Sequence, residues 1–573
     1  MISIVSVEHM RRIEAAADAS GLTYDMMMEN AGRAAAQRAY ALIRHLDNPR
    51  VTILVGGGNN GGDGLVAGRY LAEHEHVEVR FYLMGRRDAD QDANFKAVVE
   101  RELFIAYADD DRGQRALRQM VASADLLLDA LFGIGVRLPI TGDAAKLLRA
   151  ANQALAERRA ARPAEWTSLP TAPQQQTKLV RPQVLAIDCP SGLHCDTGEL
   201  DSNTIHADET ITFIAAKPGL LNFPGAQAVG RLSVATVGVS PQLEALQEAT
   251  EHLISAEYVR ELVPPRPADS HKGTFGKMMI VAGSVNYPGA PALAARAAYL
   301  AGVGLVTIGT PTPVVSALSG HLPEPTWLLL PHDMGVTAES AAPLILEQLG
   351  RYQALLLGPG WGLEDTTGAL LRALLEQPEA VAASSRKQRV IGFLARAQDG
   401  DDKDARHTVE LPPLVLDADA LSLLAQWENW WEIVPENSII TPHPAEMGRL
   451  CQLDTQTLQA DRWQIAREKA AAWKLIVMLK GAQTVIAAPD GRLMVLPFKS
   501  DALATAGTGD VLAGIICGLL AQGYAPFDAA AAGGYLHGLA GELAASNCGS
   551  SRSVTASDVI SAIPQAYTVI ESA

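Results

Sequence analysis

The chain has 573 residues, more than one hydrophobic core usually serves, so its length predicts two or more domains. A formal net charge of -17 argues against a nucleic-acid partner, which would require clustered Lys and Arg. Five scattered cysteines without a C-x-x-C pair, no targeting signal and no apolar run of roughly 20 residues predict a cytoplasmic protein without disulfides, structural zinc or a membrane span.

In the first half of the chain, short β-branched runs alternate with amphipathic helical stretches. This alternation predicts a parallel sheet covered by helices. Ligands bind beyond the carboxyl ends of the strands in such sheets, so the residues that follow the strands are the candidates for a site. We expect strands at residues 51–55, 77–83, 126–129, 184–187, 209–214 and 230–237.

Three of these strands are followed by polar, glycine-containing segments. Residues 56–64 read Gly-Gly-Gly-Asn-Asn-Gly-Gly-Asp-Gly, which predicts a loop whose glycines allow positive φ angles and whose side chains offer oxygen ligands. Asp129 begins Asp-Ala-Leu-Phe-Gly-Ile-Gly, and Asp188 begins Asp-Cys-Pro-Ser-Gly. Each aspartate alone could cap a helix or form a turn, but the three segments together could form one oxygen-rich pocket.

With Met-Glu-Asn-Ala-Gly at 28–32, these segments resemble the NAD(P)H-hydrate epimerase domain, also called the YjeF N-terminal domain, over most of residues 1–240. The resemblance implies a Rossmann-like three-layer αβα sandwich and makes Asp188 the candidate catalytic proton-transfer group. It places a potassium ion, a hard cation suited to oxygen ligands, on Asn60, Asp129 and Ser191. Its implied substrate contacts are Asn59, Asn60, Gly61, Gly62, Asp63, Gly133, Ile134, Gly135, Val136, Arg137, Leu138, Pro139 and Asp188.

A domain change is expected between residues 239 and 273, where the strand pattern stops and Pro-Pro-Arg-Pro occurs at 264–267. Residues 241–253 are expected to form a helical connection. Two polar stretches, 157–182 and 379–410, are expected to be surface insertions.

A second α/β pattern follows and predicts an independent core of a different fold. We expect a helix near residues 291–301 and strands at 277–283, 305–308, 354–357, 414–416, 438–441 and 475–479. Lys480 and Gly481 follow the last strand and suit nucleotide phosphates, although a lone lysine is often only a surface residue. His443 lies between prolines without a zinc partner at ligand spacing, so a substrate contact or a turn is favoured over a zinc ligand.

Residues 505–510 read Thr-Ala-Gly-Thr-Gly-Asp and precede an apolar helix pattern. Unpaired N–H groups in a first helical turn attract phosphate oxygens, and glycine lets a phosphate approach the backbone. Asp510 would then be a base at the edge of an anion hole. The alternative is that Asp510 only caps the helix.

With His-Lys-Gly-Thr-Phe-Gly at 271–276, these motifs resemble the ADP- or ATP-dependent NAD(P)H-hydrate dehydratase, which has a ribokinase-like α/β fold, over about residues 256–564. The resemblance implies that Asp510 is catalytic and that Mg²⁺ accompanies the nucleotide. Hydrate-binding positions map onto Ala290, Gly362, His443 and Asp510. Nucleotide-binding positions map onto Lys480, Gly481, Ala482, Gln483, Thr484 and Gly509.

The two resemblances imply one bifunctional enzyme of cofactor repair, with an epimerase domain at 1–245 and a dehydratase domain at 246–573. The epimerase would interconvert the R and S hydrates of NADH and NADPH, and the dehydratase would convert the S form back with ADP, less readily with ATP, giving AMP and phosphate. The implied partners are these small molecules. The resemblance also implies that the chain forms a homo-oligomer. The rivals are a small-molecule kinase, and a first half that only binds a ligand.

Overall fold

The computed structural model describes residues 1–160, 182–377 and 409–572. The chain forms two compact units, Ile2–Ala249 and Thr250–Ala573 together with Met1. The expected insertions at 157–182 and 379–410 lie almost entirely outside the described residues. Among the described residues, no helix combines the length and the apolar character that crossing a membrane requires.

The first unit contains a seven-stranded sheet in the order β4-β3-β2-β5-β6-β7-β8, in which every neighbouring pair is parallel. This confirms the predicted parallel sheet, and β4 is a strand that was not expected. Because the chain runs outward from β2 in one direction and from β5 in the other, a crevice opens at the carboxyl ends of these two strands. The strands are β2 (Arg50–Val55), β3 (Glu78–Leu83), β4 (Phe104–Tyr107), β5 (Leu126–Ala130), β6 (Gln183–Ile187), β7 (Glu209–Phe213) and β8 (Arg231–Ala235).

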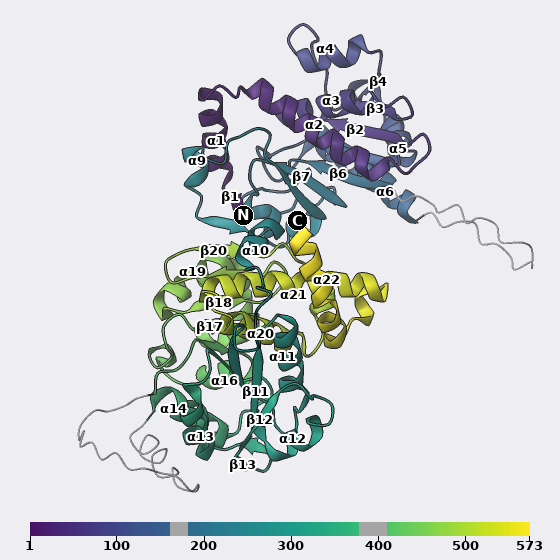
Figure 1. Cartoon of the computed structure of the whole chain (residues 1–573). Helices are drawn as coiled ribbons and strands as arrows, with labels where there is room; N and C mark the ends of the chain where they lie inside the picture. Colours follow the sequence, from purple (N-terminus) through teal and green to yellow (C-terminus); the bar gives the residue numbers. More distant parts are fainter. Residues whose placement is uncertain (161–181, 378–408, 573) are drawn as a thin grey trace, which may run out of the picture. The chain divides into compact units, whose positions relative to one another are not determined.

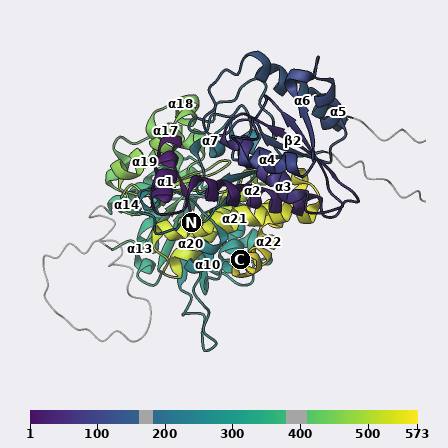
Figure 2. The ribbon, with the colours of Figure 1, turned by 90° about the horizontal axis from the view of Figure 1, so that it is seen from above.

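Helices cover both faces of this sheet. Consecutive residues of a strand point to opposite faces, so Ile53 packs into the core beneath α1 to α4, whereas Leu54 packs into the core beneath α5 and α6. Helices α2 and α3 lie side by side (Figures 1 and 2). The helices are α1 (Val7–Ala19), α2 (Tyr24–Ile43), α3 (Asn59–Leu71), α4 (Ala93–Glu100), α5 (Arg115–Ala122), α6 (Gly142–Ala160), α7 (Pro218–Leu221), α8 (Ala226–Val229) and α9 (Glu244–Gln247), and β1 is Ile2–Ile4.

The expected glycine-rich loop at residues 56–64 is wrong in its second part, because α3 begins at Asn59. Within residues 56–64, all of them described, none has a positive φ. The glycines serve close packing instead. A Cβ at Gly56 would lie 1.8 Å from the carbonyl oxygen of Leu131, and one at Gly64 would lie 2.6 Å from Cβ of Ala130.

The second unit contains a mostly parallel sheet in the order β9-β20-β19-β18-β17-β16-β15-β10-β11-β12. Only the pairs β18–β19 and β19–β20 are antiparallel. The helical connection expected over 241–253 is wrong at its end, where residues 251–253 form β9, a strand that pairs with β20. The strands are β9 (Glu251–Leu253), β10 (Lys277–Val281), β11 (Leu305–Pro311), β12 (Thr326–Leu330), β15 (Ala354–Leu357), β16 (Leu414–Leu416), β17 (Ile439–Ile440), β18 (Ile476–Leu479), β19 (Val485–Ala487) and β20 (Leu493–Val495), with a hairpin of β13 (His332–Asp333) and β14 (Val336–Thr337).

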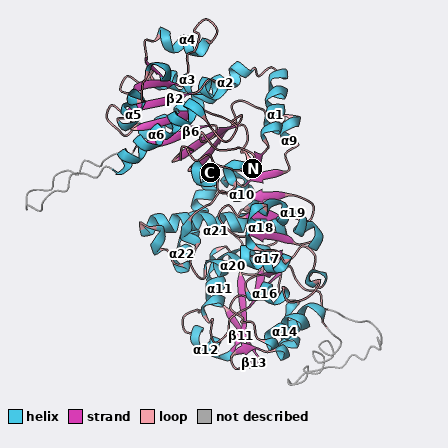
Figure 3. Cartoon of the chain, turned by 180° about the vertical axis from the view of Figure 1, so that it is seen from behind, coloured by secondary structure: helices cyan, strands magenta, loops and turns pink. Residues whose placement is uncertain are grey.

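A large apolar core joins α11, α20, α21 and α22 to this sheet (Figure 3). The predicted α/β class is thereby confirmed. The helices are α10 (Ala256–Leu262), α11 (Gly289–Leu300), α12 (Thr312–Leu318), α13 (Ala342–Leu349), α14 (Asp365–Glu376), α16 (Asp419–Leu424), α17 (Pro444–Cys451), α18 (Thr455–Ala460), α19 (Arg462–Trp473), α20 (Thr508–Ala521), α21 (Pro526–Cys548) and α22 (Ala556–Ser572).

Gly68→Ala should destabilise the first unit. A Cβ there would lie 2.2 Å from Cζ of the buried Phe81, so overpacking should cost about 1–3 kcal/mol and exceed the helix-propensity gain of about 1 kcal/mol. Thermal unfolding of the full chain measures the loss. Gly85→Ala is the matched control, because its Cβ would meet nothing within 4 Å. Equal melting temperatures for the two variants would contradict this packing.

Candidate functional site

A cavity of about 510 Å³, called the N-terminal cavity below, opens in the first unit at the carboxyl ends of β2, β5 and β6. Its place is the crevice that the strand order predicts. It is lined by Arg11, Glu14, Gly57, Gly58, Asn59, Asn60, Asp63, Met84, Leu131, Phe132, Gly133, Ile134, Gly135, Val136, Asp188, Phe213 and Lys217.

A buried lysine holds Asp188 in place within this cavity. The ammonium of Lys217, which is 1% exposed, donates to Oδ1 of Asp188 at 2.8 Å and to Oγ1 of Thr212 at 2.6 Å. The hydroxyl of Thr212 in turn donates to Asp188 Oδ1 at 3.1 Å. Burial alone would lower the pKa of Lys217, but the charge of Asp188 and its hydrogen bond outweigh burial and raise it. Lys217 and Asp188 therefore form an ion pair at the wall of the cavity.

Two further carboxyl groups, Asp63 and Glu14, face the same cavity. Burial raises the pKa of Asp63 well above its usual value, and the neighbouring charge of Asp188 raises it further. The same two causes raise the pKa of Glu14, in that order. The cavity thus combines an aspartate paired with a cation and two carboxyl groups whose pKa values are raised.

Asn60 and Asp129 are the groups in this region that fit a cation. Both polar atoms of the Asn60 side chain are buried and have no hydrogen-bond partner among the described residues. Asp129 is fully buried and accepts hydrogen bonds from the backbone N–H and the hydroxyl of Ser191, at 2.7 and 2.6 Å. Burial nevertheless raises the pKa of Asp129 to about 6. An unpaired amide oxygen and a carboxylate that has no ion-pair partner in the described part of the chain suit a hard monovalent cation.

The structure brings most of the predicted epimerase residues together. A Cβ at Gly133 would lie 3.2 Å from both Asn60 Cβ and Asp188 Oδ2, so a glycine leaves room between these two side chains. Among the predicted substrate contacts, Gly61, Gly62, Arg137, Leu138 and Pro139 do not line the cavity. Lys217 and Glu14 were not foreseen from the sequence, because Lys217 follows β7 by four residues and Glu14 lies in an ordinary amphipathic helix.

In the second unit, three groups meet at the carboxyl ends of β16, β17 and β18. The ammonium of Lys480 donates to Oδ1 of Asp417 at 2.8 Å, and Thr441 Oγ1 donates to the same oxygen at 2.7 Å. Asp417 is 1% exposed. Its charge, together with Glu446, outweighs burial and raises the pKa of Lys480. The interpretation of Lys480 as only a surface lysine is therefore wrong.

Asp510 lies in the first turn of α20, as predicted, but it does not cap the helix. The N-cap is Gly507, with φ 88°, and no side chain makes the cap hydrogen bond. Burial, followed by the charge of Asp417, raises the pKa of Asp510 to about 7, although Lys480 opposes this shift. A carboxyl group that titrates near neutral pH can act as a base. The unpaired N–H groups of the same helical turn remain available to an anion.

The predicted hydrate-binding positions lie around neighbouring strand ends. The backbone N–H of Gly362 donates to Oδ2 of Asp419 at 2.9 Å, and a Cβ at Gly360 would lie 2.9 Å from Cβ of Ala290. His443 is the N-cap of α17, where Nδ1 accepts from the backbone of Ala445 at 3.1 Å. Burial and then Lys480 lower the pKa of His443. Among the described residues, no three or more His, Cys, Asp or Glu side chains lie together in a group that could hold a metal ion.

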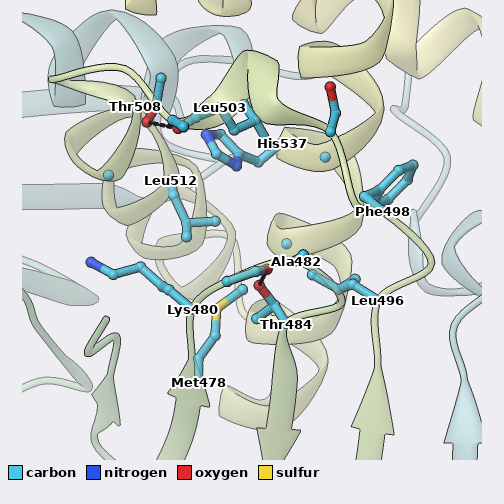
Figure 4. A pocket seen from close by; sticks show the side chains of 16 residues that line it. Met478, Lys480, Ala482, Thr484, Leu496, Phe498, Leu503, Thr508, Leu512 and His537 are labelled. Carbon is cyan, nitrogen blue, oxygen red and sulfur yellow. Dashed lines mark hydrogen bonds between the residues drawn. The ribbon is translucent and has the colours of Figure 1, made fainter. Parts of the chain in front are cut away.

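A second cavity, of about 220 Å³ and called the C-terminal cavity below, lies beside Lys480 and the start of α20 (Figure 4). The predicted residues Lys480, Gly481, Ala482, Thr484 and Gly509 line it, whereas Gln483 is buried elsewhere. Its full lining is Met478, Lys480, Gly481, Ala482, Thr484, Leu496, Phe498, Ser500, Leu503, Ala504, Thr508, Gly509, Leu512, Gly534, His537 and Gly538.

Two residues of the second unit that bear on the chemistry were not foreseen from the sequence. Asp417 directly follows the predicted strand at 414–416, so the strand-end rule could have identified it. His537 lies in the middle of the long helix α21, where only the tertiary structure places it at a cavity.

Together the fold and the cavities define an α/β enzyme of two compact units, with a cavity at the strand ends of each unit. Family models match both units: YjeF-related protein N-terminus over residues 24–219, and NAD(P)H-hydrate dehydratase over 278–383 and 395–565. The chain belongs to the family of bifunctional NAD(P)H-hydrate repair enzymes, as the sequence motifs predict.

Individual relatives support this membership along nearly the whole chain. The bifunctional NAD(P)H-hydrate repair enzyme of Moorella thermoacetica is 34% identical, over 94% of this chain and 91% of its own length. That of Thermofilum pendens is 32% identical, over 93% and 90%. The solved ADP/ATP-dependent NAD(P)H-hydrate dehydratase of Bacillus subtilis, co-crystallised with ATP/Mg²⁺, is 30% identical, with a TM-score of 0.44 over 56% of this chain and 99% of its own.

Asp510→Asn should stabilise the chain more at pH 8 than at pH 5. The folded-state pKa of about 7 exceeds the ordinary value of 3.8, so the folded chain keeps a proton that the unfolded chain loses between these values. Wild-type stability therefore falls as pH rises through that window, and the neutral amide escapes this loss. Urea midpoints at both pH values measure the difference. Asp269→Asn, at an exposed aspartate, is the control, and an equal gain at both pH values would refute the argument.

Proposed function

We propose that this chain repairs hydrated NADH and NADPH with one activity in each domain. The domain at residues 1–245 interconverts the R and S hydrates, and the domain at 246–573 dehydrates the S hydrate with ADP, or alternatively ATP. The observation that supports the proposal is that each matched region holds its own lysine–aspartate pair beside a cavity, at 2.8 Å in both cases. Fusion of the two activities lets one dehydratase repair both epimers, because the R hydrate is first converted into the S hydrate.

In the epimerase domain, Asp188 is the proposed proton-transfer group. Inversion of the hydrated carbon requires a group that takes a proton and returns it, and a carboxylate in a cavity can do both. Lys217 fixes the orientation of Asp188, since it donates to Oδ1 and leaves Oδ2 to face Gly133. Burial and the charge of Asp188 raise the pKa values of Asp63 and Glu14, which makes these two groups candidate proton donors to the same space.

Potassium is the proposed cation of this domain, held by Asn60, Asp129 and Ser191. When bound, such an ion supplies a fixed positive charge next to the substrate. Asn60 supports the assignment because its buried side-chain atoms lack partners among the described residues. Asp129 supports it because a cation would stabilise the ionised carboxylate that burial alone disfavours.

In the dehydratase domain, Asp510 is the proposed base. It takes the proton of the hydrate hydroxyl while the hydroxyl oxygen attacks the β-phosphorus of ADP, and the bond from that phosphorus to the bridging oxygen breaks to release AMP. The phosphorylated intermediate then loses inorganic phosphate and a ring proton, helped by the lone pair of the ring nitrogen. The products are NADH or NADPH, AMP and phosphate. Phosphate is a far better leaving group than hydroxide.

Lys480 and the first turn of α20 are the proposed phosphate-binding groups. Lys480 Nζ would lie 3.7 Å from a Cβ at Gly509, so the cation is adjacent to the N–H groups of this turn. Preorganised donors of this kind stabilise the charge that moves during phosphoryl transfer. Mg²⁺ would be bound by the phosphates of the nucleotide and would reach the site together with it. Ala290, Gly362 and His443 are the proposed contacts to the hydrate.

Two rival functions make different predictions. A small-molecule kinase would release a stable phosphorylated product instead of free phosphate. A first domain that only binds a ligand would not need the buried pair of Lys217 and Asp188, because isolating two charges from water is costly. We further propose that the protein is cytoplasmic and that it forms a homo-oligomer. Size-exclusion chromatography of the purified chain tests the oligomeric state.

Asp188→Asn and Asp510→Asn should separate the two activities. On a racemic hydrate mixture with ADP, Mg²⁺ and K⁺, wild type should restore all the NADH absorbance at 340 nm. Asp188→Asn should stop at the S fraction, because its dehydratase is intact. Asp510→Asn should restore almost none, with a loss of at least about 100-fold in rate. Each variant is the folding control for the other.

Chromatographic separation of the epimers completes this experiment. Asp510→Asn should still convert pure R hydrate into an R and S mixture. A repeat with ATP compares the nucleotides by rate. Full recovery by Asp188→Asn would contradict its catalytic role, and accumulation of a phosphorylated hydrate would favour the kinase.

Replacement of K⁺ by choline should slow epimerisation, and Asp129→Ala should remove the response to K⁺. The variant loses the one charged group of the proposed cation site. Epimer interconversion is measured without nucleotide, so the dehydratase does not contribute. Thermal unfolding with and without K⁺ gives a binding readout independent of activity. A wild-type chain indifferent to K⁺ in both measurements would refute the cation site.

A further inference from the structure

His537 lines the C-terminal cavity and carries an unused hydrogen-bonding atom. It lies in α21, is 7% exposed and lines the cavity. Figure 4 shows its ring beside the cavity space between Thr508, Leu512 and Phe498. Its Nε2 is buried and has no hydrogen-bond partner among the described residues. A buried polar atom without a partner is costly, so this atom calls for a ligand.

The protonation state of the ring makes Nε2 an acceptor. Burial, assisted by the charge of Lys480, lowers the pKa of His537 to about 4, so the ring is neutral at pH 7. A hydrogen bond with the backbone of Thr508 favours the protonated ring, which means that the ring donates there. In a neutral imidazole with one nitrogen donating, the other nitrogen accepts. The free atom, Nε2, is therefore the acceptor.

The walls of the cavity suit a flat heteroaromatic base. Leu496, Leu503, Leu512 and Phe498 supply apolar side chains, while Lys480 and the start of α20 form the polar end. A Cβ at Gly538 would lie 2.1 Å from the ring of Phe498, so glycine at this position lets the aromatic ring approach α21 one residue from His537. Phosphates at the polar end would place an attached base among these apolar walls and next to His537.

We propose that His537 Nε2 accepts a hydrogen bond from the exocyclic amino group of adenine and thereby selects adenine nucleotides. The inference rests on the proposed nucleotide site. Adenine carries a donor at position 6, whereas hypoxanthine carries a carbonyl there. A carbonyl at position 6 would place its oxygen, an acceptor, next to the acceptor Nε2 of His537, and neither atom would receive a hydrogen bond. Sites that hydrogen-bond a polar group strongly reject analogues that lack it.

Calorimetric titration of the full chain with three diphosphates tests the inference. ADP has the 6-amino donor, inosine diphosphate has a 6-carbonyl, and purine riboside diphosphate has only hydrogen. Wild type should bind ADP at least about tenfold more tightly than either analogue, as expected for one buried hydrogen bond. His537→Leu should lose about tenfold in ADP affinity and bind all three within about threefold. His537→Gln, which restores an acceptor oxygen, should recover part of the preference.

His321→Leu is the matched control, since His321 is exposed and lines neither cavity. It should keep the wild-type preference, and melting curves should show that the variants fold. Equal wild-type affinity for ADP and inosine diphosphate would overturn the role of His537 while leaving the nucleotide site intact. No binding of any nucleotide would overturn both. If His537→Leu does not fold, the wild-type comparison of ADP with purine riboside diphosphate decides alone.

Discussion

A buried ion pair between a lysine and an aspartate organises the site in each domain. Lys217 holds Asp188 in the first, and Lys480 holds Asp417 in the second, with 2.8 Å between the charged atoms in both. Removing two charges from water is costly, and well-packed apolar residues often serve stability better. The pairs are therefore poor candidates for structural devices. Their position at strand ends, where parallel strands open a crevice, indicates that they serve ligands.

The surrounding carboxyl groups take their properties from these pairs. Burial is the largest cause that raises the pKa values of Asp63 and Glu14, and the charge of Asp188 is the second. Burial and then the charge of Asp417 raise the pKa of Asp510 in the same way. Each domain thus places carboxyl groups with raised pKa values next to the aspartate of its ion pair. Environments that push the pKa values of neighbouring acids apart are what acid–base chemistry requires.

Several residues of both candidate sites could be predicted, because a strand end is recognisable in the sequence as an apolar run followed by polar or glycine residues. Asp188 and Lys480 directly follow a buried apolar strand, and Asp129 lies near the end of one. Asn60 and Asp510 lie in the first turn of the helix that comes after such a segment. Parallel strands bring residues of this kind to one edge. The same rule would have identified Asp417. The error at residues 56–64 has a different cause. A glycine needed for close packing and one needed for a positive φ look identical in sequence, and only the contacts of Gly56 and Gly64 distinguish them.

The sequence by itself determined the α/β class, the two domains, the family and the residues at the strand ends, because these depend on short-range patterns and motifs. Only the tertiary structure showed that Lys217 pairs with Asp188 and that His537, which carries a free acceptor, lines a cavity. Both side chains lie far along the chain from the groups they face. Burial and partners fix their charge and hydrogen-bonding roles, and these arise only when distant segments pack together.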